Sequence, residues 1–174
     1  MRDLVSDRHI DAFAYAQGTM FSLAWELYGV DECWFIGKWM CSDMRYYIDS
    51  IIPYWLYKPE GELLDRFFRE HKEYPRSSRP ISSVRMKWAG IMYGFYINYR
   101  GGWSRDLVEI LPPLELLQRF SPLHETGFDN ATIKLHDGVL GLEPKYDYKA
   151  NCWPDEAAVV EAWYKEREYL RGKF

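Results

Sequence analysis

Cysteine is scarce in this chain, and the disulfide and metal-binding patterns built on it are missing. The 174 residues include three cysteines, Cys33, Cys41 and Cys152, with no C-x-x-C pair among them. An odd number argues against a disulfide framework, and the missing pair argues against a structural zinc site. Both points are typical of a protein of the reducing cytoplasm.

Long apolar runs are missing as well. No segment is long and apolar enough to cross a bilayer. Residues 1–30 lack the basic start, the apolar stretch and the small-residue cleavage site of a signal peptide. We therefore expect a cytoplasmic protein with no membrane association.

The common catalytic motifs are also absent. The sequence contains no G-x-S-x-G elbow, no phosphate-binding G-x-x-x-x-G-K loop and no G-x-G-x-x-G fingerprint. His124, Glu125, Asp129 and His136 are near one another along the chain, but their spacing matches no helix-borne ligand pair such as H-E-x-x-H. An enzyme that uses this group stays open as an alternative. The sequence favours a protein with no catalytic site, no metal and no cofactor.

Charge is distributed unevenly. The chain has 22 bases and 26 acids in total, whereas residues 74–105 contain six bases and no acid. Elsewhere 16 bases are outnumbered by 26 acids, a net charge of −10. This division indicates one basic surface on an otherwise acidic protein, unless the bases only balance acids on neighbouring helices.

Aromatic residues are abundant. Eight Trp, fourteen Tyr and nine Phe make up 18% of the chain, more than we expect one small domain to bury. Tyr, Trp and Arg are also the residue types enriched in protein interfaces. The predicted partner-binding residues are the aromatic residues after Pro53 and the basic-aromatic stretch: Tyr54, Trp55, Tyr57, Arg76, Arg79, Arg85, Lys87, Arg100, Trp103 and Arg105.

Residues 82–100 read as a buried central helix. Apolar residues recur there at steps of three and four, and most of the remaining positions are apolar too. Gly90 and Gly94 would let a second helix approach closely. Ser82 or Ser83 can cap the first turn, and Gly101 can end the helix. The recurring apolar positions are Val84, Trp88, Ile91, Phe95 and Tyr99.

The rest of the chain predicts a mostly α, single-domain helical bundle over residues 1–174 that packs around this helix. Residues 131–142 have two readings, a small β-hairpin around Asp137-Gly138 or a helical turn that ends at Gly138. Residues 53–58 and 75–80 read as loops. The other predicted helices are 7–28, 31–52, 60–73, 104–111, 113–120 and 154–171.

Two stretches resemble small helical proteins of gut-dwelling Firmicutes. In Phe35 to Asp49, Ser42 and Asp49 match a run of that group. In Trp88 to Glu125 the matching pattern is Trp88-Ala89-Gly90, a tyrosine-rich helix, Gly102-Trp103-Ser104, Glu109-Ile110-Leu111-Pro112, a leucine-rich helix, and Phe120 to Glu125. Those proteins are encoded beside candidate toxin–antitoxin genes, including ADP-ribosyltransferase-like toxins. The resemblance implies partner binding in a mobile-element or defence setting, and it transfers no catalytic residue.

Together these features predict a non-enzymatic, protein-binding inhibitor or accessory protein of a bacterial or phage conflict system, of antitoxin or anti-CRISPR type. Its partner would be a toxin or a defence nuclease, whose functional surface it covers. The alternative is a nucleic-acid-binding regulator that uses the basic-aromatic residues. A second copy of the chain is a further partner to consider.

Overall fold

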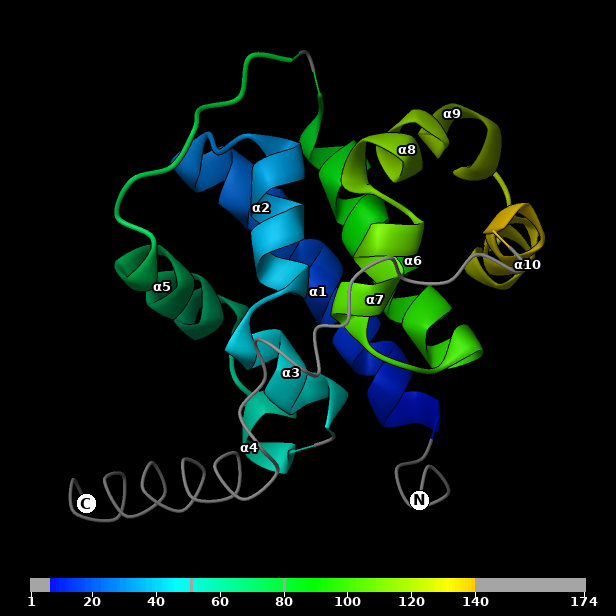
Figure 1. The fold of residues 1–174 in the computed structure, drawn as a ribbon, viewed down its shortest axis with the longest axis horizontal. Coiled ribbons are helices and arrows are strands. Elements are labelled where there is room, and N and C mark those ends of the chain that lie inside the picture. Colours follow the sequence, from blue (N-terminus) through cyan, green and yellow to red (C-terminus); the bar gives the residue numbers. More distant parts are fainter. Residues whose placement is uncertain (1–6, 51, 80, 140–174) are drawn as a thin grey trace.

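The computed structural model describes residues 7–50, 52–79 and 81–139, and it confirms the mostly α class (Figure 1). These residues form ten helices and no strand. The predicted helix at 154–171 lies outside the described residues. The helices are α1 Asp7–Tyr28, α2 Glu32–Met40, α3 Asp43–Asp49, α4 Pro53–Leu56, α5 Glu60–Glu70, α6 Ser83–Arg100, α7 Ser104–Ile110, α8 Pro113–Gln118, α9 Phe120–Leu123 and α10 Phe128–Val139.

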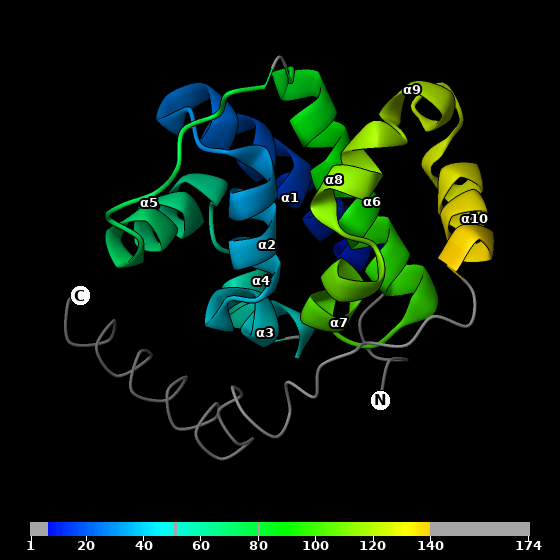
Figure 2. The same cartoon turned by 45° about the horizontal axis from the view of Figure 1, so that its top comes forward.

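The predicted central helix is α6. Other helices surround it in both views, with α1 passing behind it and α7 to α10 on its other sides (Figures 1 and 2). Ser82 caps it by accepting a hydrogen bond from the Arg85 amide, and Gly101 ends it with a φ of 76°. Val84 and Tyr99 were expected on the buried face, but they are 65% and 55% exposed. One narrow face of α6 therefore reaches the surface.

α1 and α6 pack backbone against backbone through small residues. A Cβ atom on Gly90 would lie 2.8 Å from the Cα atom of Gly18, and one on Gly94 would lie 2.5 Å from the Ala14 Cβ atom. Real Cβ atoms do not approach other carbon atoms so closely. Because the interior is already close-packed, an added methyl group would have no room between the two helices. The contact therefore requires glycine at these positions of α6, as the sequence indicated.

Gln17 joins three helices inside the core. It is 1% exposed. Its Nε2 atom donates to the Gly90 carbonyl on α6 at 2.8 Å, and its Oε1 atom accepts from Trp39 Nε1 on α2 at 3.0 Å. In the sequence Gln17 only interrupted an apolar stripe, because the pattern of one helix does not show what lies opposite it.

The variant Gln17→Leu is expected to lower the free energy of unfolding by about 2 kcal/mol, because the Trp39 indole N–H and the Gly90 carbonyl would stay buried without their partner. Urea denaturation measures this change. Adding Trp39→Phe should cost less in the variant than in the parent, since the indole N–H has already lost its acceptor. Equal costs in both backgrounds would show that the bond contributes nothing.

Three predicted elements were wrong in detail. The helix predicted over 31–52 is two helices, because the Ser42 side chain caps α3 by accepting from the Arg45 amide. The predicted loop after Pro53 begins with the short helix α4. The hairpin reading fails because residues 128–139 form α10, whose Ala131 and Leu135 are buried.

Candidate functional site

The loop between α5 and α6 lies against the turn between α1 and α2. The Asp31 amide donates to the Pro75 carbonyl at 2.8 Å, and the Ser77 amide donates to the Gly29 carbonyl at 2.9 Å. Gly29 has a φ of 57°, which lets the chain turn sharply between the two helices. Two short backbone bonds thus fix a loop that has no regular structure of its own.

A buried carboxylate adds a third anchor for this loop. Glu32, in the first turn of α2, is 0% exposed. Its Oε1 atom accepts from Trp25 Nε1 at 3.1 Å and from the Ser77 hydroxyl. Residues of α1, α2 and the loop therefore meet at one oxygen atom, and the loop's arginines are held in place relative to the helices.

Arg76 and Arg79 extend from this anchored loop and are exposed. Arg76 donates from Nη1 to the Tyr28 carbonyl and lies over the Tyr74 ring at 5.1 Å. Arg79 donates from Nη1 to Cys33 Sγ at 3.0 Å. Both side chains are thereby oriented at the surface while most of each guanidinium still faces water.

The Cys33 thiol beside Arg79 is not an activated nucleophile. Burial raises its pKa, and the hydrogen bond and charge of Arg79 oppose that increase only in part. A thiol is a weak nucleophile compared with a thiolate. The pair is better described as a contact that positions Arg79.

The loop leads directly into the first turn of α6, where Arg85 is half-buried over the Phe120 ring at 5.2 Å. We call Arg76, Arg79 and Arg85 the basic end. The loop that carries Arg76 and Arg79 runs from α5 past α2 to the start of α6 (Figures 1 and 2). Leu27, next to the Tyr28 carbonyl that holds Arg76, is 70% exposed, although the helix pattern placed it in the core.

The structure does not bring the ten predicted partner-binding residues together. Trp55 and Arg105 are 1% and 3% exposed, so neither can contact a partner in this conformation. Trp103 stacks on Tyr46 with ring centroids 5.2 Å apart and is half-buried. Arg100, Trp103 and Arg105, which are close together in the sequence, therefore do not form one exposed group.

The remaining predicted residues are dispersed. Tyr54 accepts a hydrogen bond from Lys58 Nζ at 2.6 Å and is half-buried, whereas Tyr57 is 64% exposed. Arg100 is half-buried in the last turn of α6. Lys87 is exposed on α6, on the face that carries Val84. Arg76, Arg79 and Arg85 follow the loop into the first turn of α6, and Lys87 comes in the next turn of the same helix.

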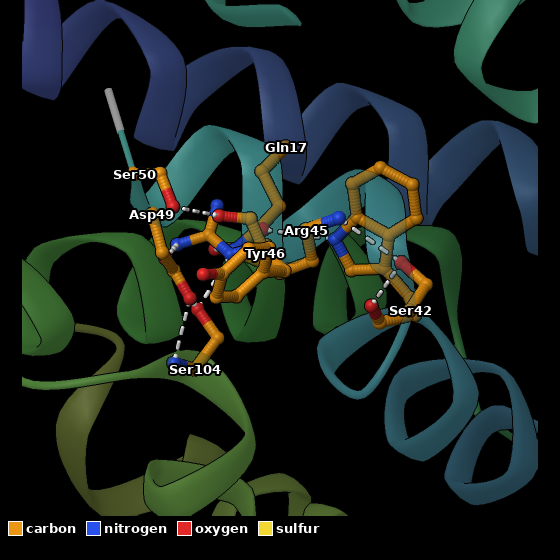
Figure 3. Close-up of polar contacts among 9 residues, drawn as sticks. Gln17, Ser42, Arg45, Tyr46, Asp49, Ser50 and Ser104 are labelled. Carbon is orange, nitrogen blue, oxygen red and sulfur yellow. Dashed lines mark hydrogen bonds and ion pairs between the residues drawn. The ribbon is translucent and has the colours of Figure 1, made fainter. Parts of the chain in front are cut away.

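A second charged group is buried between α3 and α7 (Figure 3). Arg45 Nη2 and Asp49 Oδ1 are 3.0 Å apart, and their side chains are 2% and 4% exposed. Ser104 donates its amide to Asp49 Oδ2 and its hydroxyl to Asp49 Oδ1, both at 2.8 Å, and accepts from Arg45 Nε. Arg105 also points inward, because its Nη2 atom donates to the Cys41 carbonyl at 3.0 Å.

The pKa of Asp49 in this buried group is shifted, as pKa values in active sites often are, but the side chains of Arg45, Asp49 and Ser104 are all buried. Burial raises the pKa of Asp49, while Arg45 and the two bonds from Ser104 oppose the increase. Arg45 also lies over the Phe13 ring at 4.9 Å, which closes it off further. We interpret the group as a structural joint, by which we mean a polar contact that holds α3 against α7. Sequence reasoning missed Arg45 because an arginine between apolar residues of a helix usually marks the solvent side.

The histidine group considered as a catalytic or metal site is not assembled. The His124 ring stacks on Phe120 at 4.3 Å, whereas His136 lies against Tyr99 at 5.2 Å. Among the described residues no three His, Cys, Asp or Glu side chains are grouped as metal ligands. Within the same residues no helix is long and apolar enough to span a membrane.

Comparison with known proteins provides no further guide to the basic end. No family model, no curated protein and no solved structure matches this chain.

Proposed function

We propose that this protein is a non-enzymatic inhibitor or accessory protein of a bacterial or phage conflict system, of antitoxin or anti-CRISPR type. It would bind a protein partner, a toxin or a defence nuclease, and cover that partner's functional surface with the basic end. Its site of action would be the cytoplasm. The resemblance to proteins encoded beside toxin–antitoxin genes supports this setting.

The observation that carries the proposal is the anchored pair Arg76 and Arg79. Both guanidinium groups are exposed, and each is oriented by a hydrogen bond to another part of the fold. Holding an arginine in place before binding reduces the side-chain entropy that association must overcome. Arginine also makes bidentate bonds to carboxylates, so an acidic protein surface fits this end.

The alternative, a nucleic-acid-binding regulator, has weaker support. It needs several bases and stacked aromatic rings on one surface. Arg105 is buried and the Trp103 ring is already stacked on Tyr46. The basic end retains the charge for phosphate contacts, and the ring beside Arg76, Tyr74, is half-buried.

The double variant Arg76→Glu/Arg79→Glu tests the proposal. Affinity capture from a bacterial host lysate should recover a protein partner with the parent chain, and the variant should lose at least tenfold in affinity, because like charges would face each other across the interface. Binding of the purified partner, measured by calorimetry, should weaken as salt is added.

Lys38→Glu/Lys134→Glu is the matched control, since it makes the same charge change at two exposed lysines of α2 and α10. Both double variants should unfold at the parent temperature. If the control reduces binding as much as the arginine variant, the basic end is not the site. Recovery of nucleic acid alone, with a steep loss on adding salt, would favour the alternative function.

A further inference from the structure

The outer face of the α1–α6 pair is mostly apolar, and α10 borders one end of it, where Phe128 packs against Tyr15 and Phe95. On α1 the exposed or half-exposed side chains follow one stripe, and a matching stripe follows α6. α1 passes behind α2 and α6 in Figure 1, so this face points away from the viewer. We call it the α1–α6 face. Its exposed or half-exposed residues are Ala12, Tyr15, Ala16, Thr19, Ser22, Leu23, Glu26 and Leu27 of α1, and Val84, Lys87, Phe95, Asn98 and Tyr99 of α6.

The two ends of this face differ. At one end Tyr15 packs edge-on against Phe95 at 5.8 Å and against Phe128 of α10 at 5.9 Å. Tyr15 and Tyr99 are still 47% and 55% exposed there. At the other end Leu27 and Val84 are 70% and 65% exposed. Exposed apolar side chains therefore lie at both ends of the face, and large exposed apolar areas often mark interaction sites.

The charges on the face are one acid and one base, on different helices. Glu26 is in the last turn of α1, and Lys87 is in the second turn of α6. The helices run antiparallel, since Gly18 lies against Gly90 and Ala14 against Gly94. Glu26 and Lys87 therefore lie towards the same end of the face, on opposite sides of its midline.

We propose that the α1–α6 face binds a second copy of this chain, related by a two-fold axis that runs along the helix pair. That axis places α1 of each copy over α6 of the other, at the same height. Glu26 of one copy then lies within about 8 Å, along the helix axis, of the level of Lys87 of the other, and Tyr15 within about 9 Å of the level of Tyr99; the symmetry repeats both pairs. A surface that complements itself in charge and in aromatic content fits a second copy better than a charged foreign surface.

The size of the face agrees with a reversible dimer. α6 is about 27 Å long, and two adjacent helices are about 20 Å wide, which gives an area on the order of 550 Å² on each copy. Stable interfaces bury about 800 Å² on each partner, so a dimer in the micromolar range is expected.

Exchange of the two charges tests this arrangement. The parent should sediment as a dimer at high micromolar concentration. Glu26→Lys and Lys87→Glu should each raise the dimer dissociation constant at least tenfold, because each places like charges together at both symmetric positions. The double variant should recover the parent dimer. An equimolar mixture of the two single variants should form a one-to-one heterodimer, since each supplies the charge that the other needs.

Lys38→Glu is the control and should leave the dimer unchanged. The proposal is overturned if the parent stays monomeric at high micromolar concentration, or if the parent dimerises and the mixed single variants remain monomers. Far-ultraviolet circular dichroism on each variant separates loss of pairing from loss of fold. Arg76 and Arg79 lie outside the α1–α6 face, so the dimer and the binding of a foreign partner can fail independently.

Discussion

The variant Gly90→Ala is expected to lower the free energy of unfolding by about 3 kcal/mol, a large part of the stability of a domain of this size. The midpoint of thermal unfolding should fall by about 6–12 °C. The expected loss is large because the added methyl group would lie 2.8 Å from both the Gln17 carbonyl oxygen and the Gly18 Cα atom. Both neighbours are backbone atoms of α1, so no side-chain rotation can relieve the contact.

Gly37→Ala is the control for this measurement. Gly37 lies within α2, and nothing lies within 4 Å of a Cβ atom built on it. Alanine is the better helix former by up to about 1 kcal/mol, so this variant should be slightly more stable than the parent. Opposite signs for the two variants would isolate the α1–α6 contact. A Gly90→Ala protein as stable as the parent would show that the helices can separate without cost.

The second large effect is expected at the buried ion pair. Asp49→Ala should destabilise the protein by about 3–5 kcal/mol, because it leaves the Arg45 guanidinium buried without its counter-charge. The Ser104 amide and hydroxyl would lose their acceptor in the same step. The measurement is chemical denaturation followed by tryptophan fluorescence.

Removing both charges should cost less than the two single losses added together. In Arg45→Met/Asp49→Ala no uncompensated charge stays buried, so the main penalty is the unpaired Ser104 amide, about 1–3 kcal/mol. A double-mutant cycle measures the coupling directly. Additive single losses would mean that Arg45 and Asp49 do not act as a pair, and that the joint between α3 and α7 depends on packing.

The sequence predicted the fold well for helices whose ends and burial depend on their own residues. α1 ends at Tyr28 as expected because Gly29 is needed for the turn after it. α6 has ten of its 18 residues buried because most of its positions are apolar. The break in the 31–52 segment was missed because a serine inside an apolar pattern can either face solvent or cap a new helix. The side chain of Ser42 does the second and caps α3.

The candidate site was less predictable, because a site depends on which residues face each other across elements. Arg105 belongs to the basic stretch of the sequence, but Gly101 and Gly102 turn the chain so that α7 packs against α2 and α3. Trp55 is covered by the side chains around it, since Arg66 lies over its ring at 4.8 Å and Tyr47 stacks on it at 5.2 Å. Neither neighbour could be inferred from local spacing.

The Ser42, Asp49 and Ser104 positions of the resemblance have structural roles here. Ser42 caps α3, and Asp49 binds Ser104 across the joint. Matches at these positions reflect how the helices are joined. The three residues of the basic end lie outside both matching stretches, since the second stretch begins at Trp88.

The bond between Gln17 and Gly90 joins residues 73 positions apart. During synthesis, α1 leaves the ribosome long before its main packing partner exists. At usual elongation rates the delay is about 4–15 s, during which the apolar side of α1 has no native surface to cover it. The early half of this chain therefore leaves the ribosome with that apolar side exposed, and slower translation would lengthen that exposure.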